Sequence, residues 1–375
     1  MKLILTLTLC LFGLWAYVYA PMLGDTVGWV LEDGTWALGK ATGSLTTPRG
    51  LTALTWQWVQ TPQSAHLLSL GLHVIITGLV ALYVWGLRLS PLTAWASSVF
   101  FLVNPIAVET AAYAASRSEQ IAALGVLLAC LCATLQTQRK WLYIPFFIWV
   151  GILGKDSAIV AFGLVPLTLW FTRQEWKWPA VIGLFVLSEG AHYRYGTYDQ
   201  IANFPDYAPQ ITAWDWILVQ ATATWRILIS ALAGIGMTPD FDYDRVPVGY
   251  QITALCFLGV MATLIGWRHR LLTLCIAGLL ISVAPRFLVQ TPTSYLNEHQ
   301  FYTPLIWVVM GVAAGVVAFG DLVARRAEDV YILGAALILA LCRHRGSPAE
   351  PLGVGHRGPL ACRHMDPIRV ISRAR

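Results

Sequence analysis

The chain has 375 residues, of which 57% are hydrophobic and only 12% are charged. Soluble domains carry roughly 25% charged residues, so this chain cannot cover itself with a polar surface. The composition excludes a soluble enzyme or binding module and indicates a protein whose solvent is lipid. Long apolar runs cross a bilayer as helices, because their backbone polar groups must be satisfied internally.

Apolar runs recur along most of the chain. They lie at about 3–20, 66–87, 91–104, 119–136, 141–153, 157–171, 178–190, 213–236, 250–266, 271–288, 303–320 and 329–342. The run at 213–236 carries Gln220 and Arg226, so we interpret it as an interfacial or re-entrant helix. We therefore predict an all-α polytopic membrane protein, with about eleven transmembrane helices in a domain over residues 1–342.

Loop charges predict the orientation of this domain. With the N-terminus in the cytoplasm, basic residues fall on the cytoplasmic side at 88, 139–140, 173, 268–270 and 325–326. The loops at 21–63, 105–118 and 289–302 and the turn at 154–157 then lie outside. We expect the protein in a bacterial inner membrane, or in the endoplasmic reticulum membrane of a eukaryote.

The segment 343–375 changes composition abruptly to arginine, histidine, proline and glycine. Its seven arginines and two acids give seven minus two, the whole net charge of +5. We interpret it as an out-of-frame translation or a truncated gene; a disordered tail is the alternative. Nothing in it indicates a nucleic-acid site, and the chain has neither a P-loop nor a dinucleotide fingerprint.

Paired acids in the first outer loop are the first candidates for chemistry. Glu32 and Asp33 follow an apolar stretch at the membrane exit, which suits a general base or a metal ion. The alternative is that both are solvated loop residues without a chemical role. Because no histidine or further acid lies nearby, a divalent metal is not assumed.

The second outer loop places Glu109, Tyr113 and Arg117 four residues apart, so they share one face if this piece is a single helix. Glu109 and Arg117 could form a structural pair, or a carboxylate beside a guanidinium that binds phosphate. Asn104 precedes Pro105, which predicts a helix end there.

Two further outer segments carry charged pairs. Lys155 and Asp156 form a turn that is either an interfacial anchor or an ammonium placed beside an anionic headgroup. Glu298 and His299 lie among aromatic residues and suit either polar lining or a ligand pair.

Taken in order, these segments resemble a known family. The stretches are 29–33, 48–52, 71–73, 101–109, 116–119, 154–156, 225–226, 239–243 and 298–304. They are similar to the membrane part of the transmembrane and tetratricopeptide-repeat O-mannosyltransferases and their bacterial relatives, in the GT-C class of glycosyltransferases. The resemblance covers roughly 25–320. His299 stands where the family has arginine and Asn104 where it has histidine, and the repeat domain is absent.

The resemblance implies an inverting transfer of a sugar, such as mannose, from a polyprenyl-phosphate donor to a hydroxyl of a protein or glycan on the outer face. Asp33 would be the general base, with Glu32 as the alternate. The implied donor-phosphate ligands are Arg117, Lys155 and Arg49. Glu109 and Glu119 would orient these cations or the acceptor, and further site candidates are Asp156, Glu298 and His299.

Three other functions remain open on the sequence. A flippase or transporter of lipid-linked glycans would use the same cations but no base. A glycan polymerase or ligase would share the donor but join preassembled glycans. The third alternative is an inactive fragment, which the abrupt change of composition at 343–375 suggests.

Overall fold

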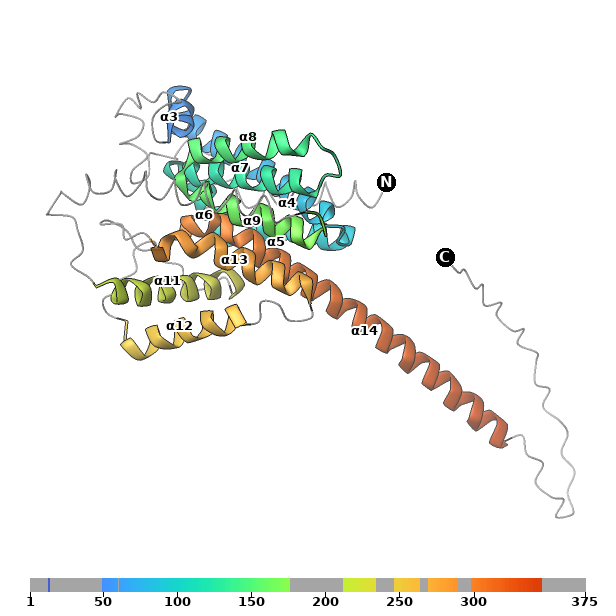
Figure 1. The fold of residues 1–375 in the computed structure, drawn as a ribbon. Coiled ribbons are helices and arrows are strands. Elements are labelled where there is room, and N and C mark those ends of the chain that lie inside the picture. The colour runs from blue at the N-terminus through green and yellow to red at the C-terminus, as the bar shows by residue number, and fades with distance from the viewer. Residues whose placement is uncertain are drawn as a thin grey trace, which may run out of the picture. The chain divides into compact units, whose positions relative to one another are not determined.

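A computed structural model describes Gly13 and residues 49–59, 61–175, 212–233, 246–263, 269–288 and 298–345. All regular structure in these residues is helical (Figure 1). The chain divides into two units, Met1–Phe319 and Gly320–Arg375, and the first holds the helix bundle. The tail beyond residue 345 and the loop that carries Glu32 and Asp33 lie outside the described residues.

The first half of the bundle is a series of helices that run back and forth. They are α3 (Gly50–Gln57), α4 (Pro62–Gly86), α5 (Pro91–Val103), α6 (Pro105–Ala112), α7 (Arg117–Thr134), α8 (Lys140–Gly154) and α9 (Ala161–Phe171). Proline in the first turn starts α4, α5 and α6, where its fixed φ and missing N–H cost nothing. At 1.5 Å per residue, the 25 residues of α4 extend about 37 Å, enough to cross a hydrocarbon core.

The predicted helix end at Asn104 is confirmed. Asn104 is extended, and its side chain accepts from the Ile106 N–H at 3.1 Å, so α6 starts afresh after a 54° bend. The condition under which Glu109, Tyr113 and Arg117 share a face, a single helix over 109–117, is not met. Tyr113 is extended and ends α6, and the short helix η2 (Ala114–Ser116) precedes α7. Glu109 and Arg117 therefore do not share one helix face.

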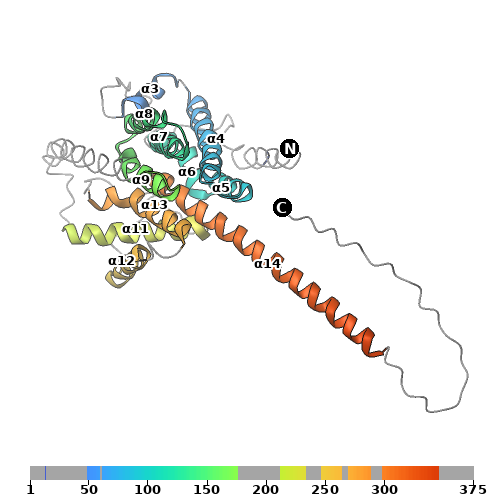
Figure 2. The same ribbon diagram turned by 45° about the vertical axis from the view of Figure 1, so that its right-hand side comes forward.

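The second half adds α11 (Ala213–Ala233), α12 (Val248–Thr263), α13 (Arg270–Leu288), the short helix η5 (Glu298–Phe301) and α14 (Tyr302–Arg345). Figure 2 shows α11, α12 and α13 beside the first group. The predicted break between the runs at 303–320 and 329–342 is wrong, because α14 continues through both. The intervening residues are mostly good helix formers, and no proline interrupts them.

Small residues bring α7 and α8 into close contact. A Cβ added to Gly125 of α7 would lie 2.5 Å from the Gly151 backbone of α8. Such close approach of glycines lets the two helices gain van der Waals contact along their length, as in other membrane bundles.

Five described helices are long and apolar enough to cross a membrane, or six if the bent pair α5–α6 is one span. The interpretation of 213–236 as too polar to cross is not supported, because α11 passes this test and buries Gln220, Thr222 and Thr224 against its neighbours. Helices α8 and α12 and the segment Asp156–Phe171 are apolar but shorter. Apart from Gly13, the runs at 3–20 and 178–190 lie outside the described residues, so the count of about eleven stays a prediction.

Candidate functional site

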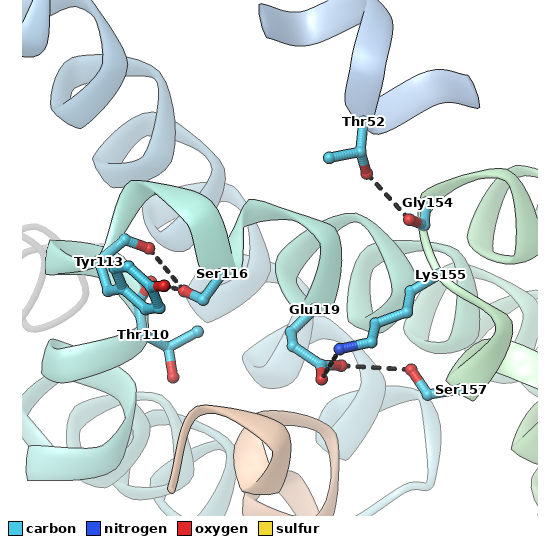
Figure 3. Close-up of polar contacts among 8 residues, drawn as sticks. All are labelled: Thr52, Thr110, Tyr113, Ser116, Glu119, Gly154, Lys155 and Ser157. Atoms are coloured by element: carbon cyan, nitrogen blue, oxygen red, sulfur yellow. Dashed lines mark hydrogen bonds and ion pairs between the residues drawn. The ribbon is translucent and has the colours of Figure 1, made fainter. Parts of the chain in front are cut away.

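One end of the bundle gathers segments that are far apart in the sequence. The ends of α6, α8 and α13 meet the starts of α3, α7 and η5 there. Figure 3 shows the side chains that connect some of these segments. The structure thus brings together the predicted outer segments around 105–118, 154–157 and 298–302.

A buried ion pair lies at the centre of this end. Lys155 Nζ donates to Glu119 Oε1 at 2.6 Å, and Ser157 Oγ donates to Glu119 Oε2 at 3.2 Å (Figure 3). The side chains of Lys155 and Glu119 are only 9% and 3% exposed. Such burial makes desolvation expensive, so each charge depends on its partner.

Local structure explains how the pair forms. Glu119 is in the first turn of α7, where a negative charge interacts favourably with the helix dipole. Lys155 is the extended residue that ends α8. Gly154 lies so close to Ile121 that an added Cβ would be 2.4 Å from its Cγ2, which holds the lysine backbone against α7.

The electrostatic neighbours of this pair are basic residues. The electrostatic neighbours of Lys155 are Glu119, Arg286 and Arg49. Burial, helped by these two arginines and opposed by Glu119, lowers the pKa of Lys155 from 10.5 to about 8. The Glu119 carboxylate also feels His299. Lys155 and the two arginines form a local cluster of positive charge that attracts an anion, and the carboxylates of Glu109 and Asp156 lie at the same end of the bundle.

Helix α3 is fixed to this end through its first turn. Thr52 Oγ1 donates to the Gly154 carbonyl at 2.9 Å (Figure 3). Arg49, which precedes α3, adopts a left-handed backbone with φ of 58°. A non-glycine residue rarely takes this conformation, and its occurrence beside Lys155 marks a strained position next to the ion pair.

Arg117 is placed differently from what its predicted phosphate role requires. Its side chain is fully buried and donates to Ser69 Oγ at 3.3 Å, Thr55 Oγ1 at 3.3 Å and the Ala65 carbonyl at 3.0 Å. Its guanidinium also lies over the Trp56 ring, 4.4 Å from the centroid. These contacts connect α7 to α3 and α4, so the geometry favours a structural role.

His299 and Tyr113 meet at the edge of the site. Their ring centroids are 5.8 Å apart, with the planes at 73°. Ser116 Oγ donates to the carbonyls of Thr110 and Tyr113 at 2.6 and 2.7 Å, which fixes the turn between α6 and α7 (Figure 3). The aromatic contact anchors η5 to that turn.

For three other predicted site residues, the structure gives the position in the fold. Glu109 on α6 and Asp156 in the short helix η3 (Asp156–Val160) are partly buried at this end, and the backbone of Glu298 begins η5. Within the described ranges, no group of three or more histidine, cysteine, aspartate or glutamate side chains could hold a metal ion.

Sequence reasoning missed Arg286 and Ser157. Arg286 is an arginine in the last turn of an apolar helix, and Ser157 is two residues after Lys155. A charge at the end of a predicted span was a usable signal for Arg286. A lone serine gives no such signal, because its role depends on the distance to Glu119.

Comparisons of the chain with protein-family models, with curated proteins and with solved structures found no match.

Proposed function

We propose that this protein is a membrane glycosyltransferase that moves a sugar from a polyprenyl-phosphate donor to a hydroxyl acceptor. The observation that carries the proposal is the buried pair Lys155–Glu119 with Arg49 and Arg286 as further electrostatic neighbours of the lysine. A cluster of a lysine and two arginines at the end of a membrane bundle suits a lipid-linked phosphate. The ordered resemblance to GT-C enzymes supports the same conclusion.

In this proposal the phosphate is held by Lys155, Arg49 and Arg286. The acceptor oxygen attacks the anomeric carbon, and the bond from that carbon to the phosphate oxygen breaks with inversion. Polyprenyl phosphate leaves with the bonding electrons, and the nearby cations stabilise its developing charge. Mannose is the sugar that the family resemblance suggests, and a protein or glycan hydroxyl is the acceptor.

The acceptor proton needs a carboxylate base. Glu119 already accepts from Lys155 and Ser157, so protonating it would weaken both contacts. We assign Glu119 to positioning Lys155. Asp33 remains the proposed base, with Glu32 as the alternate, because both belong to the loop that the resemblance assigns to this step.

The test is a transfer assay with membrane fractions and a labelled polyprenyl-phosphate mannose, beside a measurement of donor binding. General-base assistance is worth about 10²- to 10⁴-fold, so Asp33→Asn should lower the transfer rate at least about 100-fold and leave donor binding intact. Near-normal transfer by both Asp33→Asn and Glu32→Gln would reject this loop as the source of the base. Binding without any transfer would favour the flippase alternative.

A further inference from the structure

The opposite end of the bundle has an unusual pair of helix endings. Helices α4 and α9 are each followed by an arginine in the left-handed conformation, Arg88 with φ of 63° and Arg173 with φ of 58°. Glycine is the usual residue at this position. The Arg173 N–H bonds to the Trp170 carbonyl at 3.2 Å, and the Arg88 N–H to the Trp85 carbonyl at 2.8 Å. Two helices therefore keep a strained arginine where glycine would be relaxed.

Both arginines line the same hollow, which has a volume of about 270 Å³. Its other polar lining residues are Thr134, Gln136 and Thr172. Helices α4 and α7 meet beside it, because a Cβ on Gly86 would lie 2.6 Å from Thr134 Oγ1. A space of this size exceeds the volume of a few water molecules and could hold a small ligand.

The charges around the hollow are mostly positive. The nearby cations Lys140 and Arg270 have partners in the protein: Lys140 donates to Gln174, and Arg270 donates to the Trp170 carbonyl at 2.6 Å. By contrast, the Arg88 and Arg173 guanidinium groups make no hydrogen bond or ion pair with the described part of the chain. Both side chains are exposed. They are the two cations that line the hollow, and within the described residues both remain available to a ligand.

We propose that this hollow binds a phosphate group, carried either by an anionic phospholipid headgroup or by a free phosphate ester. Two guanidinium groups can bind a phosphate through paired, charge-assisted hydrogen bonds. Basic pockets between transmembrane helices bind anionic lipid headgroups. The apolar neighbours Leu87 and Phe171 in the lining suit the glycerol and first acyl carbons of a lipid.

This site is separate from the proposed transferase site. Lys155 lies near the start of α7, whereas the hollow lies at its end and at the end of α4, which extends about 37 Å. The inference does not depend on the proposed function, and either can fail without the other.

The experiment titrates phosphatidylglycerol into the purified full chain in phosphatidylcholine nanodiscs and follows bound lipid by native mass spectrometry. The key variant is Arg88→Gly/Arg173→Gly, because glycine accepts the left-handed backbone while both arginine side chains, with their guanidinium groups, are removed. We expect its phosphatidylglycerol affinity to fall at least about tenfold for each lost charge-assisted contact. Its melting temperature without the anionic lipid should stay equal or rise.

The matched control is Arg139→Gln, which removes one charge from the exposed residue that precedes α8, outside the hollow. It should bind phosphatidylglycerol like the unmodified chain. Inorganic phosphate distinguishes the two sources: competition at low concentration indicates a free phosphate ester, and its failure to compete indicates a lipid headgroup. Unchanged lipid binding by the double glycine variant, or an equal loss in Arg139→Gln, would overturn the proposal.

Discussion

Removing one partner of the Glu119–Lys155 pair should destabilise the protein strongly. The atoms Nζ and Oε1 are 2.6 Å apart. At an effective dielectric constant of about 20, their attraction is about 6 kcal/mol, which opposes a desolvation cost of several kcal/mol per ion. Glu119→Gln keeps the shape of the side chain and leaves the ammonium without this counter-charge. Such losses cost about 3–5 kcal/mol.

We expect Glu119→Gln to lower the free energy of unfolding by about 3 kcal/mol, the lower end of this range, because Lys155 has a pKa of about 8 and can lose its proton in the variant. The lowered pKa means that the charged lysine opposes folding below about pH 8. The free energy of unfolding rises as the pH rises through the pKa of Lys155 in the folded protein, because the unfolded chain then binds more protons than the folded chain. The difference between Glu119→Gln and the unmodified chain should therefore shrink above about pH 8.

The assay is denaturant unfolding of the purified protein in mild detergent at pH 7 and pH 9. Glu175→Gln removes an exposed carboxylate and should change the free energy of unfolding by at most about 0.5 kcal/mol. Glu119→Gln/Lys155→Met removes both charges, so it should be less destabilised than Glu119→Gln alone, which is the signature of a coupled pair. A cost for Glu119→Gln no larger than that of Glu175→Gln would refute the reasoning.

Three other predictions concern binding and packing. In an equilibrium binding measurement, the affinity for the sugar donor should fall roughly tenfold from pH 7 to pH 9, because phosphate binds the ammonium form of Lys155, whose pKa is about 8. Lys155→Arg should make this affinity nearly independent of pH. Arg117→Lys keeps the charge but cannot make all three guanidinium hydrogen bonds, so the free energy of unfolding should fall by about 2 kcal/mol or more. Normal stability together with weaker binding of the sugar donor would support the phosphate-binding role instead. Gly125→Val should lower the free energy of unfolding by at least about 2 kcal/mol through overpacking against α8. Gly71→Ala, with open space around it inside α4, should raise that free energy by up to about 1 kcal/mol, because alanine favours a helix more than glycine does; an equal loss in both variants would contradict the close contact.

The helical class was predictable from the sequence, because apolar runs of this length have one regular solution in lipid. The break at Asn104 was predictable for a local reason, the steric restriction that Pro105 imposes on it. The continuity of α14 was not, since the charged residues between its two apolar runs suit a loop as well as a helix.

The site was predictable only in part. Lys155 and Glu119 stood out as charges beside apolar runs, but 36 residues separate them and their contact depends on the packing of α7 against α8. Arg117 shows the opposite error. The family resemblance implied a phosphate-binding role for Arg117, but its three hydrogen-bond acceptors come from α3 and α4, which no local pattern reveals.

The central claim is tested most directly by Lys155→Met in a purified transfer assay with labelled polyprenyl-phosphate mannose and a hydroxyl acceptor. Its matched control is Arg139→Gln, which removes a cation that is exposed and lies outside the site. The proposal predicts transfer by the unmodified chain, near-normal transfer by Arg139→Gln, and donor binding weakened at least about tenfold in Lys155→Met. Unchanged donor binding in a folded Lys155→Met protein, or no transfer by the unmodified chain, would contradict it.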